Sequence, residues 1–298
     1  MTDASESAKY VIISPVKDEE RYVEKTLRSV ISQTCRPEIW VIVDDGSRDS
    51  TVSIIKQAQK DHPWIRVLKT HEVSARRPGS PVIRAFNLGY KAVKDEDFDF
   101  VVKLDCDLEF DAEYFSKILS RFFDDPELGI ASGVYLEETD RSWKPVKLPD
   151  YHAAGACKVV RRACLEQIGG FIRERGWDTI DQIRARMRGC KTQHFKDLIL
   201  YHLKKEGSGI GFIRTNVIHG EIYYLTGGGW FFFLAKVLHR TLRGKPPILA
   251  GFALLFGFLR LWSTGKPRLV TEEEADCYRR LLNQRMGTFA GFGRRRGI

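Results

Sequence analysis

The sequence predicts an α/β fold: a mostly parallel sheet flanked by helices, followed by a C-terminal amphipathic helical appendage. Two observations lead to this prediction. In the first half of the chain, short apolar runs alternate with helical patterns, and this βαβαβαβ order is typical of a parallel sheet with helices on both faces. Towards the end, residues 220–298 carry 13 Lys/Arg and 5 Asp/Glu, so they hold +8 of the net charge of +9. We therefore expect two domains, residues 1–220 and a basic, aromatic-rich helical tail over residues 221–298.

Apolar runs and helical spacing define the elements of the first domain in order. Four strands are expected, at residues 10–14, 38–43, 65–68 and 98–104. Apolar residues at helical spacing predict a helix after each strand, at residues 19–33, 50–60, 82–93 and 111–123. Beyond residue 129 the pattern is less regular, and we expect helices at residues 161–168 and 178–188 and a strand at 193–200.

The composition is that of a globular protein, because 43% of the 298 residues are hydrophobic and 29% are charged. No uncharged apolar stretch reaches the ~18 residues that indicate a membrane-spanning helix, and residues 1–9 lack the apolar segment of a secretory signal. The six cysteines form no C-x-x-C pair, which argues against a zinc site or a disulfide framework and suits a reducing compartment. We therefore expect a cytoplasmic protein.

Carboxylates follow the expected strands at their carboxyl ends, where ligands bind in parallel sheets. Asp105 and Asp107 come directly after the fourth strand. On an extended segment, residues two apart point to the same side, so both carboxylates face one spot. Such a pair suits Mg²⁺ or Mn²⁺. The alternative is a solvated acidic loop.

Two further polar segments lie near strand ends. Asp44 or Asp45 could accept a hydrogen bond from a nucleobase, and Gly46 allows a sharp turn before the next helix. An ordinary turn that caps this helix would use the same residues. Three arginines beside a glycine-containing loop could bind a diphosphate, namely Arg76, Arg77 and Arg84. A solvated basic loop is the alternative here.

Five short segments, in this order and at plausible spacing, resemble family 2 glycosyltransferases. They are residues 14–20 (SPVKDEE), 27–34 (LRSVISQT), 43–47 (VDDGS), 87–89 (NLG) and 105–107 (DCD). The resemblance extends over about residues 10–220. It implies a GT-A fold, a divalent metal ion (Mg²⁺ or Mn²⁺) and a nucleotide-sugar donor, with a UDP-sugar favoured over guanosine and thymidine donors.

The resemblance also implies roles for individual residues. The nucleoside pocket would be lined by Pro15, Val16, Glu19 and Asp44, with Asp45 beside them. Arg76 or Arg84 would lie near the diphosphate, and Asp105 and Asp107 near the ribose-diphosphate and the metal. His202 would complete the metal shell, as a neutral imidazole suits Mn²⁺ better than Mg²⁺. A structural histidine is the alternative for this position.

A general base is expected where the family usually shows Glu-Asp, and this chain departs from that pattern with the segment GWDTID at residues 176–181. Asp178 is our preferred base and Asp181 the alternative, because Asp181 one turn later could orient or cap instead. Asp178 could also be only the N-cap of its helix. Trp177 could stack on a sugar ring or pack in the core.

The C-terminal tail indicates helices that lie in a membrane interface. Residues 246–259 are 14 residues without charge, bounded by Lys245 and Arg260. As a helix they would extend ~21 Å, short of the ~30 Å hydrocarbon core of a bilayer. Their basic flanks, together with Trp230 and Trp262, favour association with an anionic membrane surface. A buried helical pair that covers the sheet is the alternative.

These features together predict an inverting, metal-dependent glycosyltransferase. It would move a single sugar to the hydroxyl of a glycan or lipid-linked acceptor, at the cytoplasmic face of the membrane. Single transfer is favoured because the Q-x-x-R-W motif of processive synthases is missing. A nucleotidyltransferase of related fold is the first alternative, although residues 14–17 lack its glycine-rich loop. A non-catalytic protein that binds membranes or nucleic acid through the tail is the second, but no nucleic-acid-binding motif supports that partner.

Overall fold

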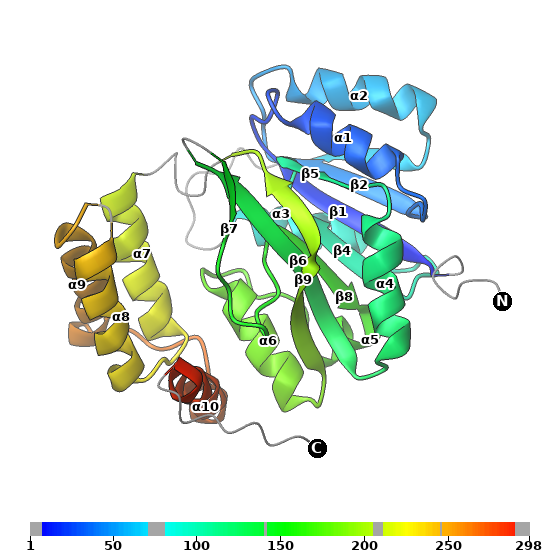
Figure 1. Ribbon diagram of the computed structural model, residues 1–298. Helices are drawn as coiled ribbons and strands as arrows, with labels where there is room; N and C mark the ends of the chain where they lie inside the picture. The colour runs from blue at the N-terminus through cyan, green and yellow to red at the C-terminus, as the bar shows by residue number, and fades with distance from the viewer. Residues whose placement is uncertain (1–7, 71–80, 140–141, 205–210, 245, 290–298) are drawn as a thin grey trace. The chain divides into compact units, whose positions relative to one another are not determined.

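A mixed sheet lies at the centre of the first part of the chain, with helices on both of its faces (Figure 1). The computed structural model describes residues 8–70, 81–139, 142–204, 211–244 and 246–289. Within them, the sheet has nine strands: eight follow the order β3-β2-β1-β4-β8-β6-β9-β5, and the ninth, β7, pairs with β6. The strands are β1 (Tyr10–Val16), β2 (Ile39–Asp44), β3 (Ile65–Lys69), β4 (Phe100–Leu104), β5 (Leu108–Phe110), β6 (Leu128–Glu138), β7 (Trp143–Pro145), β8 (Cys157–Arg161) and β9 (Lys191–His202). The helices are α1 (Val23–Ile31), α2 (Thr51–Asp61), α3 (Pro81–Val93), α4 (Tyr114–Asp124), α5 (Arg162–Gln167) and α6 (Trp177–Met187).

The α/β fold class is confirmed, but the sheet is mixed rather than mostly parallel. β3, β2, β1 and β4 pair in parallel, as expected for strands joined by helical crossovers. Beyond them, β8 is antiparallel to both β4 and β6, β6 is parallel to β9, and β9 is antiparallel to β5. After residue 129 strands no longer alternate regularly with helices, so the sequence held no signal for the direction of these pairings.

Helices cover both faces of the central strands, whose apolar runs are continuous because they are buried on both sides. Alternate residues of β1 enter different clusters. Tyr10 and Ile12 pack with residues of α1, α2 and α4, whereas Val11 and Ile13 pack with residues of α3, α5 and α6. These two layers fix the carboxyl ends of β1, β2 and β4 relative to one another.

The chain divides into two compact units, Met1–Lys205 and Glu206–Ile298. From the sequence this boundary is expected at residue 220, which lies inside α7 (Phe212–Leu225). The second unit also contains α8 (Trp230–Arg243), α9 (Leu249–Ser263) and α10 (Glu272–Phe289). None of the described helices combines the length and the apolar character that crossing a bilayer requires.

Two glycines allow α7 and α9 to pack in close contact within the second unit. A Cβ atom at Gly220 would lie 2.0 Å from the Leu254 carbonyl oxygen, and one at Gly257 would lie 2.0 Å from the Val217 carbonyl oxygen. Only a residue without a side chain fits this approach of two backbones. The core that results is largely aromatic and includes the fully buried Phe233.

Candidate active site

The loops that follow β1 and β2 hold each other through reciprocal hydrogen bonds. The Asp18 backbone amide donates to Ser47 Oγ (3.1 Å), and the Arg48 amide donates to Asp18 Oδ1 (2.8 Å). The Ser50 amide donates to Glu20 Oε2 at 3.0 Å. Acidic side chains of the first loop therefore satisfy backbone donors of the second, which fixes the rim of the strand ends.

The residues assigned to the nucleoside pocket come together because β1 and β2 run in parallel register. Pro15 lies opposite Val43, and Val16 lies opposite Asp44. The Asp44 residue is only 3% exposed, and its Oδ1 accepts a hydrogen bond from the Ser47 amide at 2.9 Å. The Asp44 carboxylate thus stabilises the turn after β2, while the backbone around it lines the strand ends.

Asp45 places one of the candidate arginines at the same strand ends. Its Oδ1 accepts a hydrogen bond from Thr70 Oγ1 at 3.0 Å and lies 3.6 Å from the Arg84 guanidinium. Arg84 belongs to α3, so this ion pair directs the start of that helix towards the carboxyl end of β2. Arg76 lies outside the described residues, so its role near the diphosphate stays a prediction.

Glu19 brings the loop after β1 into contact with the segment that follows β9. Its Oε1 lies 2.5 Å from Lys204 Nζ, while its buried Oε2 has no hydrogen-bond partner among the described residues. Burial raises the pKa of the Glu19 carboxyl, Lys204 opposes this, and the charges of Asp107 and Asp105 add to it. Glu19 is therefore part of an acidic cluster with Asp105 and Asp107.

Asp107 and His202 are in direct contact. His202 Nε2 lies 3.3 Å from Asp107 Oδ2, and His202 Nδ1 lies 3.7 Å from Glu137 Oε1. The contact follows from strand pairing, because His202 lies opposite Leu108 of β5 and Glu137 of β6. Burial lowers the pKa of His202, but the hydrogen bond and the charge of Asp107 outweigh burial, and the pKa lies above its usual value.

Asp105 is paired with a buried lysine. Lys103 Nζ lies 2.5 Å from Asp105 Oδ1 and donates to the Gly155 carbonyl at 2.7 Å. The Lys103 side chain is 3% exposed, whereas that of Asp105 is 31% exposed. Burial raises the pKa of the Asp105 carboxyl, the Lys103 charge lowers it, and Asp107 raises it. Asp105 therefore keeps one side open at the strand end and has an ammonium group behind it.

These residues fit a divalent cation in charge and in ligand type. Asp107 Oδ1 is buried, and within the described part of the chain it has no hydrogen-bond partner. Together with Asp105 it offers the carboxylate oxygens that Mg²⁺ and Mn²⁺ prefer. Among the described side chains, no three of His, Cys, Asp or Glu already converge as a metal site. A cation would neutralise the acidic cluster and give the unpaired Asp107 oxygen a partner.

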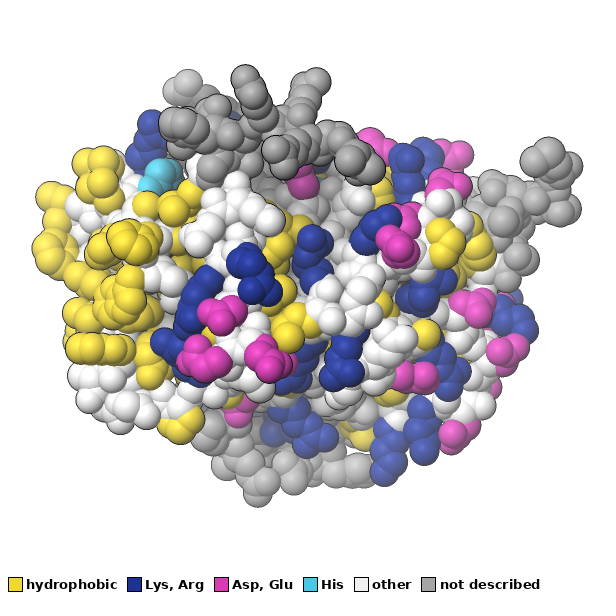
Figure 2. Space-filling model, turned by 90° about the horizontal axis from the view of Figure 1, so that it is seen from below, with side chains coloured by type: hydrophobic (Ala, Val, Ile, Leu, Met, Phe, Trp, Pro, Cys, Tyr) yellow, Lys and Arg dark blue, Asp and Glu magenta, His cyan; other side chains and the backbone are white. Residues whose placement is uncertain are grey.

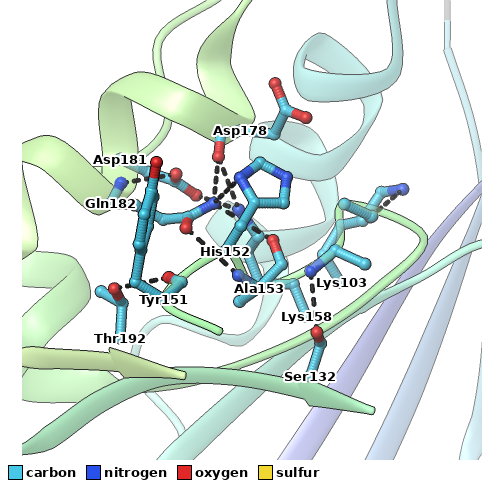
Figure 3. A network of polar contacts seen from close by, with 12 residues as sticks. Lys103, Ser132, Tyr151, His152, Ala153, Lys158, Asp178, Asp181, Gln182 and Thr192 are labelled. Carbon is cyan, nitrogen blue, oxygen red and sulfur yellow. Dashed lines mark hydrogen bonds and ion pairs between the residues drawn. The ribbon is translucent and has the colours of Figure 1, made fainter. Parts of the chain in front are cut away.

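Helix α6 places its two acidic residues in different environments (Figure 3). Asp178 is half-buried, and its carboxylate points away from the hydrogen bonds around Gln182. Gly176, with φ of +86°, is the N-cap, so Asp178 is not the capping residue. Asp181 is 2% exposed, and its Oδ2 lies 2.6 Å from Lys158 Nζ. Asp178 is thus the more accessible of the two candidate bases.

A buried network joins α6 to the segment before β8 (Figure 3). The Gln182 side-chain amide donates to the carbonyl oxygens of Asp178 and Ala153, and its Oε1 accepts from the Ala153 amide at 3.1 Å. Lys158 Nζ also donates to the Asp178 carbonyl at 3.3 Å. Burial raises the pKa of the Asp181 carboxyl to about 6, although the Lys158 charge opposes this. The network fixes the first turn of α6 and hence the position of Asp178.

Trp177 connects the acidic cluster with α6. The ammonium groups of Lys103 and Lys158 lie 5.7 Å and 4.8 Å from the centroid of its ring. These lysines face each other in the register of β4 and β8. A Cβ atom at Gly155 would lie 3.2 Å from the same ring. Trp177 therefore packs against both the lysine that pairs with Asp105 and the lysine that pairs with Asp181.

The partners of the site's carboxylates and of His202 were not predicted from the sequence. For Lys103 and Lys158 a signal existed, because each interrupts an apolar strand and a buried lysine is uncommon unless it is paired. For Lys204 and Glu137 there was none, since only the pairing of β9 brings them to the strand ends. Gln182 resembles any polar residue of a helix until its buried contacts are known.

Comparison with known proteins identifies relatives over part of the chain. A family model described as Glycosyl transferase family 2 matches residues 11–173. The poly-beta-1,6-N-acetyl-D-glucosamine synthase of Staphylococcus aureus (strain COL) is 29% identical over 119 residues, which is 39% of this chain and 26% of that protein. Its Staphylococcus epidermidis namesake is 28% identical over 116 residues, with the same shares. The chain spans about a quarter of the length of these curated relatives.

Two solved structures are similar to most of the chain. A mannosyltransferase from Pyrobaculum calidifontis, in complex with GDP-Man and Mn²⁺, gives a TM-score of 0.55 at 18% identity, covering 95% of this chain and 81% of that one. Staphylococcus aureus TarS 1–349, in complex with UDP-GlcNAc, gives a TM-score of 0.54 at 18% identity, covering 96% and 93%. At this identity the likeness concerns the fold, and it confirms the expected GT-A type.

Proposed function

The chain belongs to glycosyl transferase family 2, and from this premise we propose that it is a metal-dependent, inverting enzyme that moves one sugar from a nucleotide-sugar donor to an acceptor hydroxyl. The observation that carries the proposal is the acidic cluster of Glu19, Asp105 and Asp107 at the strand ends, with two buried carboxylate oxygens that have no hydrogen-bond partner in the described chain. A cation that binds together with the diphosphate of a donor would offset the negative charge of this cluster and give its unpaired oxygens a partner.

The donor is proposed to be a UDP-sugar. The Staphylococcus aureus relative is a synthase of an N-acetylglucosamine polymer, and TarS was solved with UDP-GlcNAc. The mannosyltransferase of similar fold was solved with GDP-Man and Mn²⁺, so a guanosine donor belongs in any test. The strand ends at Pro15 and Asp44 would hold the nucleoside, and Arg84 would face the diphosphate.

In the proposed reaction, Asp178 takes the proton of the acceptor hydroxyl as this hydroxyl attacks C1 of the donor sugar. The bond from C1 to the diphosphate oxygen breaks in the same step, so a single displacement inverts the anomeric centre. Asp105, Asp107 and His202 would hold the cation, which as a Lewis acid stabilises the charge of the departing nucleoside diphosphate. Asp181 would not act as the base, because it is 2% exposed and pairs with Lys158 inside the protein.

The acceptor is proposed to be a glycan or a lipid-linked sugar, and the enzyme to work at the cytoplasmic face of a membrane. A polymer of N-acetylglucosamine is the product named for the curated relatives. The basic second unit suits the anionic cytoplasmic leaflet.

The proposed donor and metal can be tested by thermal shift. Binding of a panel of nucleotide sugars is measured with Mn²⁺, with Mg²⁺ and with a chelator. We expect UDP-GlcNAc or another UDP-sugar to stabilise the chain only when a metal is present. Asp107→Asn should abolish the metal-dependent part, whereas Glu109→Gln, an exposed carboxylate of β5, should retain it. If no nucleotide responds, a non-catalytic role gains support.

The products of turnover test the reaction class. Release of a nucleoside diphosphate together with a glycosidic product of inverted configuration is expected. A product of retained configuration contradicts the single displacement. Release of pyrophosphate from a nucleoside triphosphate and a sugar phosphate would instead indicate a nucleotidyltransferase.

A further inference from the structure

The second unit exposes a set of apolar side chains that its own core does not use. We define the apolar face as Phe231, Leu234, Leu238 and Leu242 of α8 with Phe252 and Phe256 of α9. Each of the six is between 54% and 84% exposed. Within each helix these residues are three or four positions apart, so they lie on one side. In Figure 2 the hydrophobic side chains gather at the left into a broad area over this unit.

The two helices present this face together because they form an antiparallel pair. At one end, the Trp230 and Phe258 ring centroids are 4.7 Å apart. At the other end, a Cβ atom at Gly251 would lie 2.0 Å from Thr241 Oγ1. The inner sides of the helices are filled by buried aromatic residues such as Phe233. The apolar face is therefore a second apolar surface of the unit, separate from its core. A contiguous apolar area that is exposed to water marks an interaction site.

The segment that carries the face holds charges of one sign only. Residues 222–271 contain seven Lys/Arg and no Asp/Glu. The preceding acidic residue, Glu221, is ion-paired with Arg260 and is 10% exposed at its side chain. Acidic residues return only at the start of α10. An apolar surface on a segment whose own charges are all cationic fits a partner that is apolar inside and anionic at its surface, which describes a bilayer with anionic lipids.

Two tryptophans strengthen this choice of partner. Trp230 and Trp262 lie at the same end of the helix pair, with ring centroids 6.1 Å apart, and are 43% and 54% exposed. Tryptophan prefers the boundary between hydrocarbon and headgroups, because its ring is apolar and its N–H is polar.

We propose that the apolar face of α8 and α9 docks on an anionic lipid bilayer, with its aliphatic and aromatic side chains in the outer hydrocarbon layer and the surrounding cations at the headgroups. The two helices would lie in the plane of the interface. The proposal does not depend on the reaction proposed above, because it concerns the second unit alone.

Flotation of the full chain with lipid vesicles tests the proposal. We expect binding to vesicles of phosphatidylcholine with about 30% phosphatidylglycerol, and much weaker binding to phosphatidylcholine alone. The variant Phe231→Ser/Phe252→Ser/Phe256→Ser should bind about 10-fold less, because the inserted apolar area is removed. The matched control Met187→Ser/Ile199→Ser, which removes exposed apolar side chains from the first unit, should bind as the unaltered chain does.

A second readout separates docking by this face from attraction by charge alone. Vesicles with brominated acyl chains should quench the fluorescence of the bound protein, and Trp230→Phe/Trp262→Phe should lose most of this quenching while still binding. Binding without quenching, or equal binding of the triple variant, overturns the proposal. The proposal is also overturned if the chain does not bind vesicles. Light scattering then distinguishes two explanations: a dimer that the triple variant abolishes would show that the face binds a second copy, whereas a monomer would show that another part of the chain covers it.

Discussion

At the scale of single residues, two buried lysines connect the parts of the candidate site. Lys103 pairs with Asp105 and Lys158 pairs with Asp181, and both contact Trp177 at the start of α6. A buried ammonium is unfavourable unless it is paired, so each lysine fixes its carboxylate in one place. The donor side and the proposed base are therefore positioned through one packed group of side chains.

The accessible carboxylate of α6 is expected to be the base. Asp178→Asn should leave binding of the nucleotide sugar nearly intact and lower kcat by about 10²–10⁴-fold, the usual contribution of general base catalysis. Asp181→Asn should lower thermal stability, because it leaves Lys158 buried without its counter-charge. Steady-state kinetics and thermal unfolding of both variants check this. Loss of turnover in a stable Asp181→Asn protein, with normal turnover in Asp178→Asn, would reverse the assignment.

The Lys158–Asp181 pair predicts a pH-dependent stability. The pKa of the Asp181 carboxyl is about 6 in the folded chain, against a usual value of 3.8. The folded state therefore binds a proton on Asp181 more tightly than the unfolded state does. The stability that comes from this tighter proton binding is complete below about pH 4 and is lost as the pH rises through about 6. Lys158→Met removes a charge that lowers this pKa, so the loss should extend to higher pH.

Urea unfolding at pH 5 and pH 8 measures this effect. Lys158→Met should cost about 3–5 kcal/mol at pH 8, where it leaves an uncompensated carboxylate, and less at pH 5. Lys158→Met/Asp181→Leu should recover much of the loss at pH 8. An equal cost at both pH values, or no recovery in the double variant, contradicts the ion-pair account.

The sequence predicts which residues lie at the strand ends better than it predicts their partners. Glu19, Asp44 and Asp105 follow apolar strands, and a carboxylate at such a position is visible in the pattern alone. That Asp44 binds its own turn, or that Asp105 binds Lys103, depends on burial and register. The positions of these residues could therefore be predicted from the sequence, whereas the contacts of their side chains became known only from the structure.

At the scale of elements, helices and strands of the first half are predictable because apolar runs and helical spacing alternate there. The antiparallel strands are not, since their neighbours are set by contacts between distant parts of the chain. The glycine of the NLG segment has a structural reason. A Cβ atom at Gly89 would lie 2.6 Å from Ile13 Cγ2, so this glycine allows α3 to pack against β1.

The close contact of α7 and α9 gives a test of element packing. Gly220→Ala adds a methyl group 2.0 Å from the Leu254 carbonyl oxygen, so the helices must separate. We expect a loss of about 1–3 kcal/mol in the stability of the second unit, even though alanine favours helix by about 1 kcal/mol over glycine. Thermal unfolding followed by circular dichroism measures this, with the exposed Arg214→Ala of α7 as control. Equal stability of the two variants contradicts the close packing.

At the scale of the whole molecule, the chain combines a glycosyl transferase family 2 fold with a separate basic helical unit. The uneven charge predicts this second unit from the sequence, but the first part of α7, from Phe212, also belongs to it. The reason is that α7 contributes to the core of the helical unit through Tyr223 and Tyr224. What composition could not show is that part of the apolar surface of α8 and α9 remains outside that core.

If both proposals hold, the docked helices should raise the activity on acceptors that reside in the membrane. Docking confines the enzyme and a lipid-anchored acceptor to one surface, which increases their effective concentration. With anionic vesicles present, turnover of an alkyl glycoside with a long chain should rise about 10-fold or more over that of the same glycoside with a short chain. Phe231→Ser/Phe252→Ser/Phe256→Ser should lose this preference and keep its rate on the short-chain acceptor, because these residues lie in the second unit and outside the candidate site. A triple variant that keeps the preference would separate membrane docking from acceptor choice, whereas a triple variant slow on both acceptors would tie the apolar face to the reaction itself.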